Sequence, residues 1–282
     1  MAISHVQLYV TRLPRSFQSL AIPSSINLNM QAEAAPYIHP NIFDESTDIV
    51  AGFTTRHGGV STAPYTSLNL GLSTKDPREN VQANRQRLVE AAGFSLDQLV
   101  IAGQVHGSKI KLATEAGLFP GYDGLVTQTP GLLLCISAAD CAAVLLADAE
   151  ARVIGACHSG WRGTVANISA KTVAAMEDLG ANPARLRAYV SPCISMENFE
   201  VGPEVAAQFN DRFVHHLPGE PKPRVDLKAV IAAQLEQAGV APNAIEVSPH
   251  CTMGETDIFF SYRAENGQTG RMMGFIGMQA GE

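Results

Sequence analysis

Hydrophobic residues alternate with polar ones, or run together in short β-branched stretches, at nine places along the chain. Both patterns are typical of β-strands. The connections between the four expected strands that lie between residues 123 and 159 are too short for a helical crossover. We therefore expect antiparallel or mixed sheet in the middle of the chain, and strands over 49–56, 99–107, 123–127, 132–140, 142–148, 152–159, 186–192, 244–251 and 271–278.

Apolar positions three and four residues apart predict helices between these strands. The first is expected over 76–93, with Asp76 as the N-cap, Pro77 as the first helical residue and Glu79 as the acid of a capping box. Because strands follow one another with helices inserted between them, the pattern predicts an α+β fold around one large sheet. We expect a single layered domain with a mixed, largely antiparallel β-sheet and flanking helices, the others over 165–179, 202–213 and 226–239.

The first 40 residues differ in composition from the rest of the chain. No acidic residue precedes Glu33, which is a feature of transit peptides. A disordered tail, or a start codon assigned too early with Met30 as the true start, explains the same composition. We favour a disordered or non-native extension over 1–40 and one folded domain over 41–282, a length sufficient for a sizeable core.

The overall composition restricts the partners and the compartment of the protein. A net charge of -7 argues against nucleic-acid binding, which needs a basic face, but leaves room for a small anionic ligand. No apolar run reaches the roughly 18 to 20 residues that span a bilayer, so no membrane association is expected. Five widely spaced cysteines without a Cys-x-x-Cys pair are unlike a disulfide framework and indicate the reducing cytoplasm.

Three of the predicted strands end at or near side chains that bind metals, namely His106 in QVHG, Cys141 in AADC and His158 in GACHSG. If they converge, two imidazoles and one thiolate leave a fourth position open, which is the pattern of a catalytic zinc site. The same donors suit copper. A lone histidine or cysteine is more often a core residue, so the spacing leaves both interpretations open. No His-x-His pair is available for a multinuclear copper cluster, and His215 and His216 are expected on the surface.

Arginines beside glycines form a second group of candidates. Arg56 and His57 in FTTRHGGVS occupy a turn where a guanidinium and backbone N–H groups can bind one oxyanion. Arg162 in GWRGT precedes a helix N-terminus, and Arg263 in FFSYR ends a strand. A tight turn with an exposed arginine explains the first motif equally well. Dinucleotide, P-loop and His-x-Glu zinc-deaminase signatures are absent from the sequence.

Cys157 and Trp161 lie beside the candidate ligand His158 and have expected roles of their own. Cys157 alternates with His158, so its side chain points to the opposite face and is expected in the core. Trp161, the only tryptophan, is expected as a wall of the pocket or a prop under the turn. Asp140 and His57 lie nearest to the named residues and are candidates for proton transfer.

The chain resembles the YfiH/DUF152 family, also called the polyphenol oxidoreductase laccase family, which includes laccase domain-containing protein 1. Eight stretches carry the resemblance in order, and together they cover about residues 45–278. One departure is Ala143, where the family usually has proline. The matching stretches are FTTRHGGVS, PYTSLNLG, QVHG, DGLVT, AADC, GACHSGWRGT, SPCIS with FEVG, and CT with FFSYR.

The resemblance implies that His106, Cys141 and His158 bind Zn²⁺ and that Arg56 binds phosphate. It implies a purine nucleoside phosphorylase that accepts adenosine, inosine, guanosine and methylthioadenosine and also deaminates adenosine. Its partners would be purine nucleosides and phosphate, with the three ligands and Arg56 as catalytic residues. Substrate binding would involve Arg56 together with His57, Arg162 and Arg263.

Two other activities compatible with the same residues stay open at this point. An older assignment for the family is a copper-dependent, laccase-like polyphenol oxidase that uses Cu²⁺ in the same ligand set. A Cys-His hydrolase or deamidase would use Cys141 as the nucleophile and His158 or His106 as the base, and the family fold is similar to that of bacterial toxin deamidases of the CNF1 type. A monomer is the oligomeric state we favour.

Overall fold

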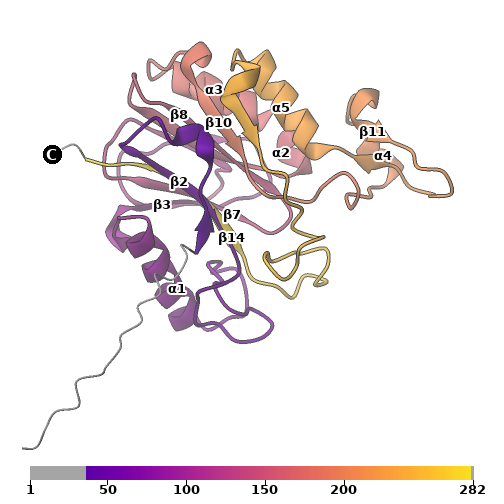
Figure 1. The fold of residues 1–282 in the computed structure, drawn as a ribbon, viewed down its shortest axis with the longest axis horizontal. Coiled ribbons are helices and arrows are strands. Elements are labelled where there is room, and N and C mark those ends of the chain that lie inside the picture. Colours follow the sequence, from indigo (N-terminus) through magenta and orange to yellow (C-terminus); the bar gives the residue numbers. More distant parts are fainter. Residues whose placement is uncertain (1–35, 281–282) are drawn as a thin grey trace, which may run out of the picture. The chain divides into compact units, whose positions relative to one another are not determined.

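A computed structural model describes residues 36–280, which form two six-stranded mixed sheets, a two-stranded ribbon and flanking helices (Figure 1). Of the expected N-terminal extension, 1–40, residues 1–35 lie outside the described residues. Tyr37–Ile38, within its last residues, forms a short strand, β1, that pairs with Phe53 and Thr54. None of the helices described is long and apolar enough to cross a membrane.

The first sheet is antiparallel on one side and parallel on the other. β2 and β7 flank β14 in antiparallel pairing, whereas β3 runs parallel to both β7 and β5. In spatial order its strands are β1, β2 (Ile49–Thr54), β14 (Met272–Met278), β7 (Leu133–Ala138), β3 (Leu99–Ala102) and β5 (Gly117–Phe119).

The second sheet contains the strands that lead to two of the candidate ligands. Its centre is antiparallel, and a parallel strand is added at each edge. In spatial order its strands are β13 (Ile245–Val247), β10 (Arg187–Val190), β8 (Ala142–Asp148), β9 (Val153–Ser159), β6 (Gly124–Thr127) and β4 (Ile110–Leu112); β11 (Val214–His215) and β12 (Arg224–Val225) form the ribbon.

The two sheets pack face to face around a shared core. Gly274 of β14 lies so close to β8 that a Cβ added there would be 2.4 Å from the Cβ of Ala143, so only glycine fits. Ile136 and Leu145, which are fully buried, belong to the same core cluster. The single large sheet expected from the sequence is therefore wrong, although the α+β class and the mixed, largely antiparallel pairing are confirmed.

Helices cover the outer faces of both sheets (Figure 1). Leu88 and Val89 of α1 pack against the first sheet in a cluster with Leu133 and Phe275. α3 contacts β6 and β9, and α5 contacts β10 and β13, on the second sheet. The helices are α1 (Arg78–Ala91), α2 (Trp161–Val165), α3 (Ile168–Glu177), α4 (Pro203–Ala206) and α5 (Leu227–Gln237), with 3-10 turns at Asn41–Phe43, Leu96–Gln98, Pro183–Arg185, Asp211–Phe213 and Pro242–Ala244.

The helix predictions are confirmed with three corrections. Asp76 does not cap α1, because its carboxylate accepts hydrogen bonds from the Ser61 hydroxyl at 2.6 Å and the Asn69 amide at 2.9 Å. The helix expected over 165–179 is divided at Asn167, whose φ of 58° lies in the left-handed region. The stretch 202–213 forms only α4 and a separate 3-10 turn, whereas α5 begins directly after Asp226, close to its predicted start, and the Asp226 side chain caps it.

Candidate metal centre

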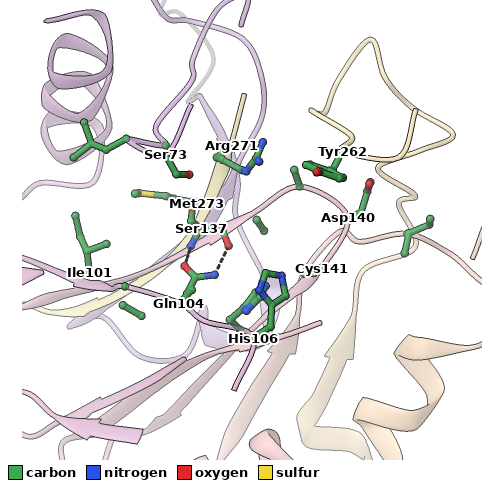
Figure 2. Close-up of a pocket in the computed structure, with 18 of the residues that line it drawn as sticks. Ser73, Ile101, Gln104, His106, Ser137, Asp140, Cys141, Tyr262, Arg271 and Met273 are labelled. Atoms are coloured by element: carbon green, nitrogen blue, oxygen red, sulfur yellow. Dashed lines mark hydrogen bonds between the residues drawn. The ribbon is translucent and has the colours of Figure 1, made fainter. Parts of the chain in front are cut away.

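His106, Cys141 and His158 come together at one end of the two sheets. Their candidate ligand atoms all lie within 4.8 Å of one another, and the two imidazole rings meet edge to face at 4.9 Å (Figure 2). A tetrahedral zinc ion with bonds of about 2.0–2.3 Å separates its ligand atoms by about 3.3–3.8 Å. The three side chains therefore fit a metal ion with small adjustments, and all three line the cavity beside them.

Tight backbone geometry aims the three ligands at one point. His106 lies after β3 with a φ of 58°, and Asp140, in the crossing from β7 to β8, has a φ of 85°. This crossing carries the chain from the first sheet to the second and places Cys141 at the start of β8. A Cβ on Gly160 would lie 2.6 Å from the Cys141 sulfur, so the residue after β9 has to be glycine.

Asp123, at the start of β6, is a buried carboxylate that holds two of the three ligands. One oxygen accepts hydrogen bonds from the His106 N–H at 2.9 Å and from His158 Nδ1 at 3.1 Å. The other accepts the N–H groups of Val105 at 3.1 Å and Gly107 at 2.8 Å. Since Nδ1 of His158 faces a carboxylate, its Nε2 is left for a metal, the usual arrangement around a metal-binding histidine. Sequence reasoning assigned this residue only to a strand start.

The electrostatics of the cluster favour a thiolate. Burial acts to raise the pKa of Cys141, but the charge of His158 and hydrogen bonds from both imidazoles outweigh it and lower that pKa to about 6. Burial also acts to lower the pKa of His158, which the negative charge of Cys141 and the hydrogen bond to Asp123 raise to about 9. Burial opposes ionisation of Asp123, yet its bonds to His158, Gly107 and Val105 hold its pKa below the ordinary value.

The cluster opens onto a cavity of about 730 Å³. Two hydrogen bonds join Gln104 to Ser137 in the cavity wall. The Gln104 side-chain NH₂ group donates to the Ser137 carbonyl at 2.8 Å, and the Gln104 side-chain oxygen accepts the Ser137 N–H at 2.8 Å (Figure 2). This clasp fixes the loop that carries His106 against β7. The cavity wall contains both apolar and cationic side chains. The apolar ones include Ile101, Leu118, Met273 and Trp161, the cationic ones are Arg85, Arg263 and Arg271, and Ser73 and Asp140 also line the cavity.

The arginine singled out by the sequence lies outside this cavity wall. The guanidinium of Arg56 donates to the carbonyls of Thr66, at 3.0 Å, and Thr256. It also pairs with Glu265 at 3.3 Å and stacks on Phe260, with its centre 4.7 Å from the ring. Each of its three nitrogens thus donates a hydrogen bond within the chain. These contacts join the turn that carries Arg56 to the segments around Thr66, Thr256 and Glu265.

The other predicted anion ligands are distributed differently. His57 does not line the cavity, and neither does Arg162, whose guanidinium stacks 4.1 Å from the ring of Trp161. Arg263 does line it and donates to the carbonyl of Glu200 at 3.1 Å. Two further arginines in the wall, Arg85 and Arg271, were not among the sequence candidates: Arg85 lies within a predicted helix, and Arg271 begins a predicted strand, although Gly270 precedes it.

Asp140 lines the cavity, but donors from the C-terminal loops surround its carboxylate. It accepts hydrogen bonds from the hydroxyls of Thr252 at 2.8 Å and Ser261 at 2.7 Å, and from the N–H of Arg263 at 2.6 Å. This network ties those loops to the residue next to Cys141, which is a structural use of the carboxylate. Trp161 lines the cavity, as expected.

Within residues 36–280, the His106–Cys141–His158 set is the one group of three or more histidine, cysteine or acidic side chains with metal-binding geometry. One mononuclear site is therefore what the described part of the chain provides.

Comparisons with known proteins agree with this architecture. A sequence model described as multi-copper polyphenol oxidoreductase laccase matches residues 50–279. A purine nucleoside phosphorylase of Deinococcus radiodurans is 48% identical over 228 residues, which cover 80% of this chain and 88% of the relative. The Bacillus subtilis relative, purine nucleoside phosphorylase YlmD, is 30% identical over 277 residues and covers 93% of this chain and 97% of its own length.

Solved structures show the same fold. The crystal structure of YlmD from Geobacillus stearothermophilus aligns with a TM-score of 0.81 at 34% identity, covering 88% of this chain and 98% of that one. The crystal structure of Bacillus licheniformis hypothetical protein YfiH aligns with a TM-score of 0.82 at 32% identity, with the same coverage of both chains. The chain therefore belongs to the YfiH and YlmD family, which the matching sequence model describes as multi-copper polyphenol oxidoreductase laccase.

Proposed function

We propose that the protein is a zinc-dependent purine nucleoside phosphorylase that accepts adenosine, inosine, guanosine and methylthioadenosine and also deaminates adenosine. The observation that carries the proposal is the His106–Cys141–His158 cluster at the edge of a cavity of about 730 Å³, in a chain 48% identical to a protein named purine nucleoside phosphorylase. A cavity of this size is in the range of small-molecule sites. Purine nucleosides and phosphate are the proposed ligands.

Zinc is the metal we propose for the three side chains. Two imidazoles and one thiolate with an open position match mononuclear catalytic zinc sites. When bound, the ion would supply Lewis acidity at this end of the cavity. Asp123 would hold the imidazole of His158 in the tautomer that presents Nε2 to the ion. The five cysteines are all free, which supports the proposed cytoplasmic location.

The rest of the cavity suits a nucleoside. Ile101, Leu118 and Met273 provide apolar surface for the purine, and Trp161 provides an aromatic wall. In phosphorolysis the bond from the ribose C1′ to the purine nitrogen breaks while a phosphate oxygen bonds to C1′. The electron pair of the broken bond goes to the purine, which takes up a proton. Phosphate held in line with this bond lowers the barrier, because the reaction then needs no further ordering.

A copper-dependent, laccase-like polyphenol oxidase is the main alternative, favoured by the description of the family and by a thiolate donor that copper also accepts. A Cys-His hydrolase or deamidase is favoured by the hydrogen bonds between Cys141 and both imidazoles. Metal analysis, and oxygen uptake with a phenol, separate the first from the phosphorylase. A chelator separates the second, since a cysteine hydrolase keeps its activity when the metal is removed.

The deciding experiment incubates the purified protein with adenosine, with and without phosphate, and follows adenine, ribose 1-phosphate and inosine by chromatography. We expect adenine and ribose 1-phosphate only with phosphate, inosine under both conditions, and about one zinc ion per chain. Cys141→Ala should lose the metal and both activities, whereas the neighbouring Cys157→Ala should keep them. If no purine product forms, or if Cys141→Ala works as well as the wild type, the proposal is wrong.

A further inference from the structure

Two partly buried guanidinium groups in the cavity wall form no ion pair within the described residues, 36–280. Arg85 of α1 donates through Nε to the carbonyl of Leu70 at 3.0 Å, and Arg271 donates through one Nη to the carbonyls of Thr269 at 3.0 Å and Gly270 at 2.9 Å. Over residues 36–280 neither arginine forms an ion pair. Each therefore has donors left over beside the cavity.

One short segment holds both arginines at this wall. Besides accepting from Arg85, Leu70 donates its N–H to the carbonyl of Arg271 at 3.0 Å, and the side-chain oxygen of Asn69 accepts the N–H of Arg271 at 2.9 Å. A Cβ on Gly71 would lie 2.5 Å from Cγ of Arg271, so the glycine makes room for the arginine stem. Ser73, two residues on, also lines the cavity.

Figure 2 shows Arg271 and Ser73 on one side of the cavity and His106 with Cys141 on the other. The cavity thus has a metal end and an arginine end, defined by the His106–Cys141–His158 cluster and by Arg85 with Arg271. A substrate that spans the cavity would contact both ends.

The cost of burying these groups points to a ligand. Burial lowers the pKa of both Arg85 and Arg271, and negative groups beyond ion-pair distance, Asp140 among them for Arg271, offset this only in part; a guanidinium nevertheless keeps its proton in proteins. A charge that loses water without gaining a counter-charge is destabilised. Two other partly buried arginines, Arg56 and Arg224, meet carboxylates at 3.3 and 2.6 Å, so this chain does pair such arginines elsewhere. An anion from solution would supply the missing charge.

We propose that Arg85, Arg271 and Ser73 form an anion subsite that binds the phosphate dianion at the arginine end of the cavity. The assignment rests on the proposed phosphorylase function and replaces Arg56 as the phosphate ligand. Arginine forks match the tetrahedral oxygens of phosphate, and a hydroxyl can donate to a third oxygen. From this end an oxygen of phosphate attacks C1′ while the purine leaves toward the rest of the cavity.

The test uses Arg85→Gln, Arg271→Gln and Ser73→Ala, with Arg87→Gln as the matched control. Arg87 is an exposed residue of the same helix and does not line the cavity. Binding of inorganic phosphate to the zinc-loaded protein is measured by calorimetry, and the KM for phosphate by phosphorolysis. We expect each arginine substitution to weaken both about tenfold or more, Ser73→Ala about threefold, and Arg87→Gln less than twofold. Arg271→Lys should fall in between, because it keeps the charge without the fork.

Adenosine deamination needs no phosphate and serves as the internal reference. We expect its rate in the Arg85, Arg271 and Ser73 variants to fall less than their affinity for phosphate does, and to stay within about twofold in Arg87→Gln, which does not line the cavity. Phosphate binding that is unchanged in both arginine variants overturns the subsite, whatever the activity of the wild type. Binding of a nucleoside 5′-monophosphate, but not of inorganic phosphate, would overturn the cosubstrate assignment. A wild type that binds phosphate through these arginines but releases no purine overturns the phosphorylase function alone.

Discussion

The two ends of the cavity are built in opposite ways. At the metal end each ligand is held by another part of the chain: Asp123 fixes His158 and the backbone of His106, and Gly160 packs on the sulfur of Cys141. At the arginine end the guanidinium groups of Arg85 and Arg271 donate to carbonyls alone and have donors left over.

This difference separates structural from ligand-binding polar groups. A charged side chain whose nitrogens or oxygens each bond within the chain stabilises the fold or positions a neighbour, as the three nitrogens of Arg56 and the two oxygens of Asp123 do. A charged side chain that is partly buried and unpaired at a cavity indicates a missing ligand. The metal end is thus prepared before any ligand arrives, whereas the arginine end is completed by one.

The largest effect is expected on metal affinity, from the substitution Asp123→Asn at the metal end. The amide has one acceptor oxygen, so its NH₂ group would face N–H donors that now meet a carboxylate. Loss of such a supporting carboxylate typically costs about 10–100-fold in metal affinity. We expect a loss in this range, measured by competition with a chromophoric chelator.

Asp148→Asn is the matched control for that substitution. Asp148 is also a buried carboxylate that accepts backbone N–H groups, at 3.1 Å from Ala151 and 2.8 Å from Asn182, but it does not line the cavity. Its substitution should leave the zinc affinity within about twofold. Equal losses of affinity in the two variants would show that Asp123 acts on the metal only through general stability.

The next largest effect is expected on stability, from Arg56→Gln. This substitution tests whether an arginine whose three nitrogens all bond within the chain stabilises the fold. The substitution removes the ion pair with Glu265 and the bonds to Thr66 and Thr256. We expect the free energy of unfolding to fall by about 2–3 kcal/mol, since the pair is partly buried. Urea titration measures this loss. The KM for phosphate should change less than twofold, and a tenfold rise with intact stability would restore Arg56 as the phosphate ligand.

Strand patterns place His106, Cys141 and His158 next to strand ends, but the spacing alone does not show that they converge, and it is the resemblance to the family that implies a shared metal. The sequence does not reveal that the Arg56 guanidinium bonds to other parts of the chain, since Thr256 and Glu265 lie in loops about two hundred residues away. Arg85 is hidden for the same reason: in the helix it is one polar residue among several, and only contact with Leu70 turns it toward the cavity. Alternation also predicts β7 and β8 without showing that they belong to different sheets.

A smaller, pH-dependent effect is expected at Asp148 itself. Burial opposes its ionisation, but bonds from Asn182, Arg185 and Ala151 hold its pKa below the ordinary 3.8. The ionised form is therefore favoured in the folded state, and its stabilisation is complete above the ordinary value and is lost as pH falls through the lowered one. We expect Asp148→Asn to cost about 1–2 kcal/mol at pH 7. The difference in stability from the wild type should shrink below about pH 4, and a difference that grows there would contradict this role.

The smallest effect should come from Cys157, the neighbour of His158 that points away from the metal. Cys157 is fully buried in the core together with Ile168 and Val173 of α3, and burial raises its pKa to about 12. A neutral thiol of this kind acts as a small apolar group. Cys157→Ala should cost about 1 kcal/mol, or a few degrees in melting temperature. Zinc content and phosphorolysis should stay at the wild-type level, because alternation along β9 separates the two faces. If Cys157→Ala lost the metal at preserved stability, packing at position 157 would be shown to position His158. The metal end would then depend on the opposite face of the sheet as well as on Asp123.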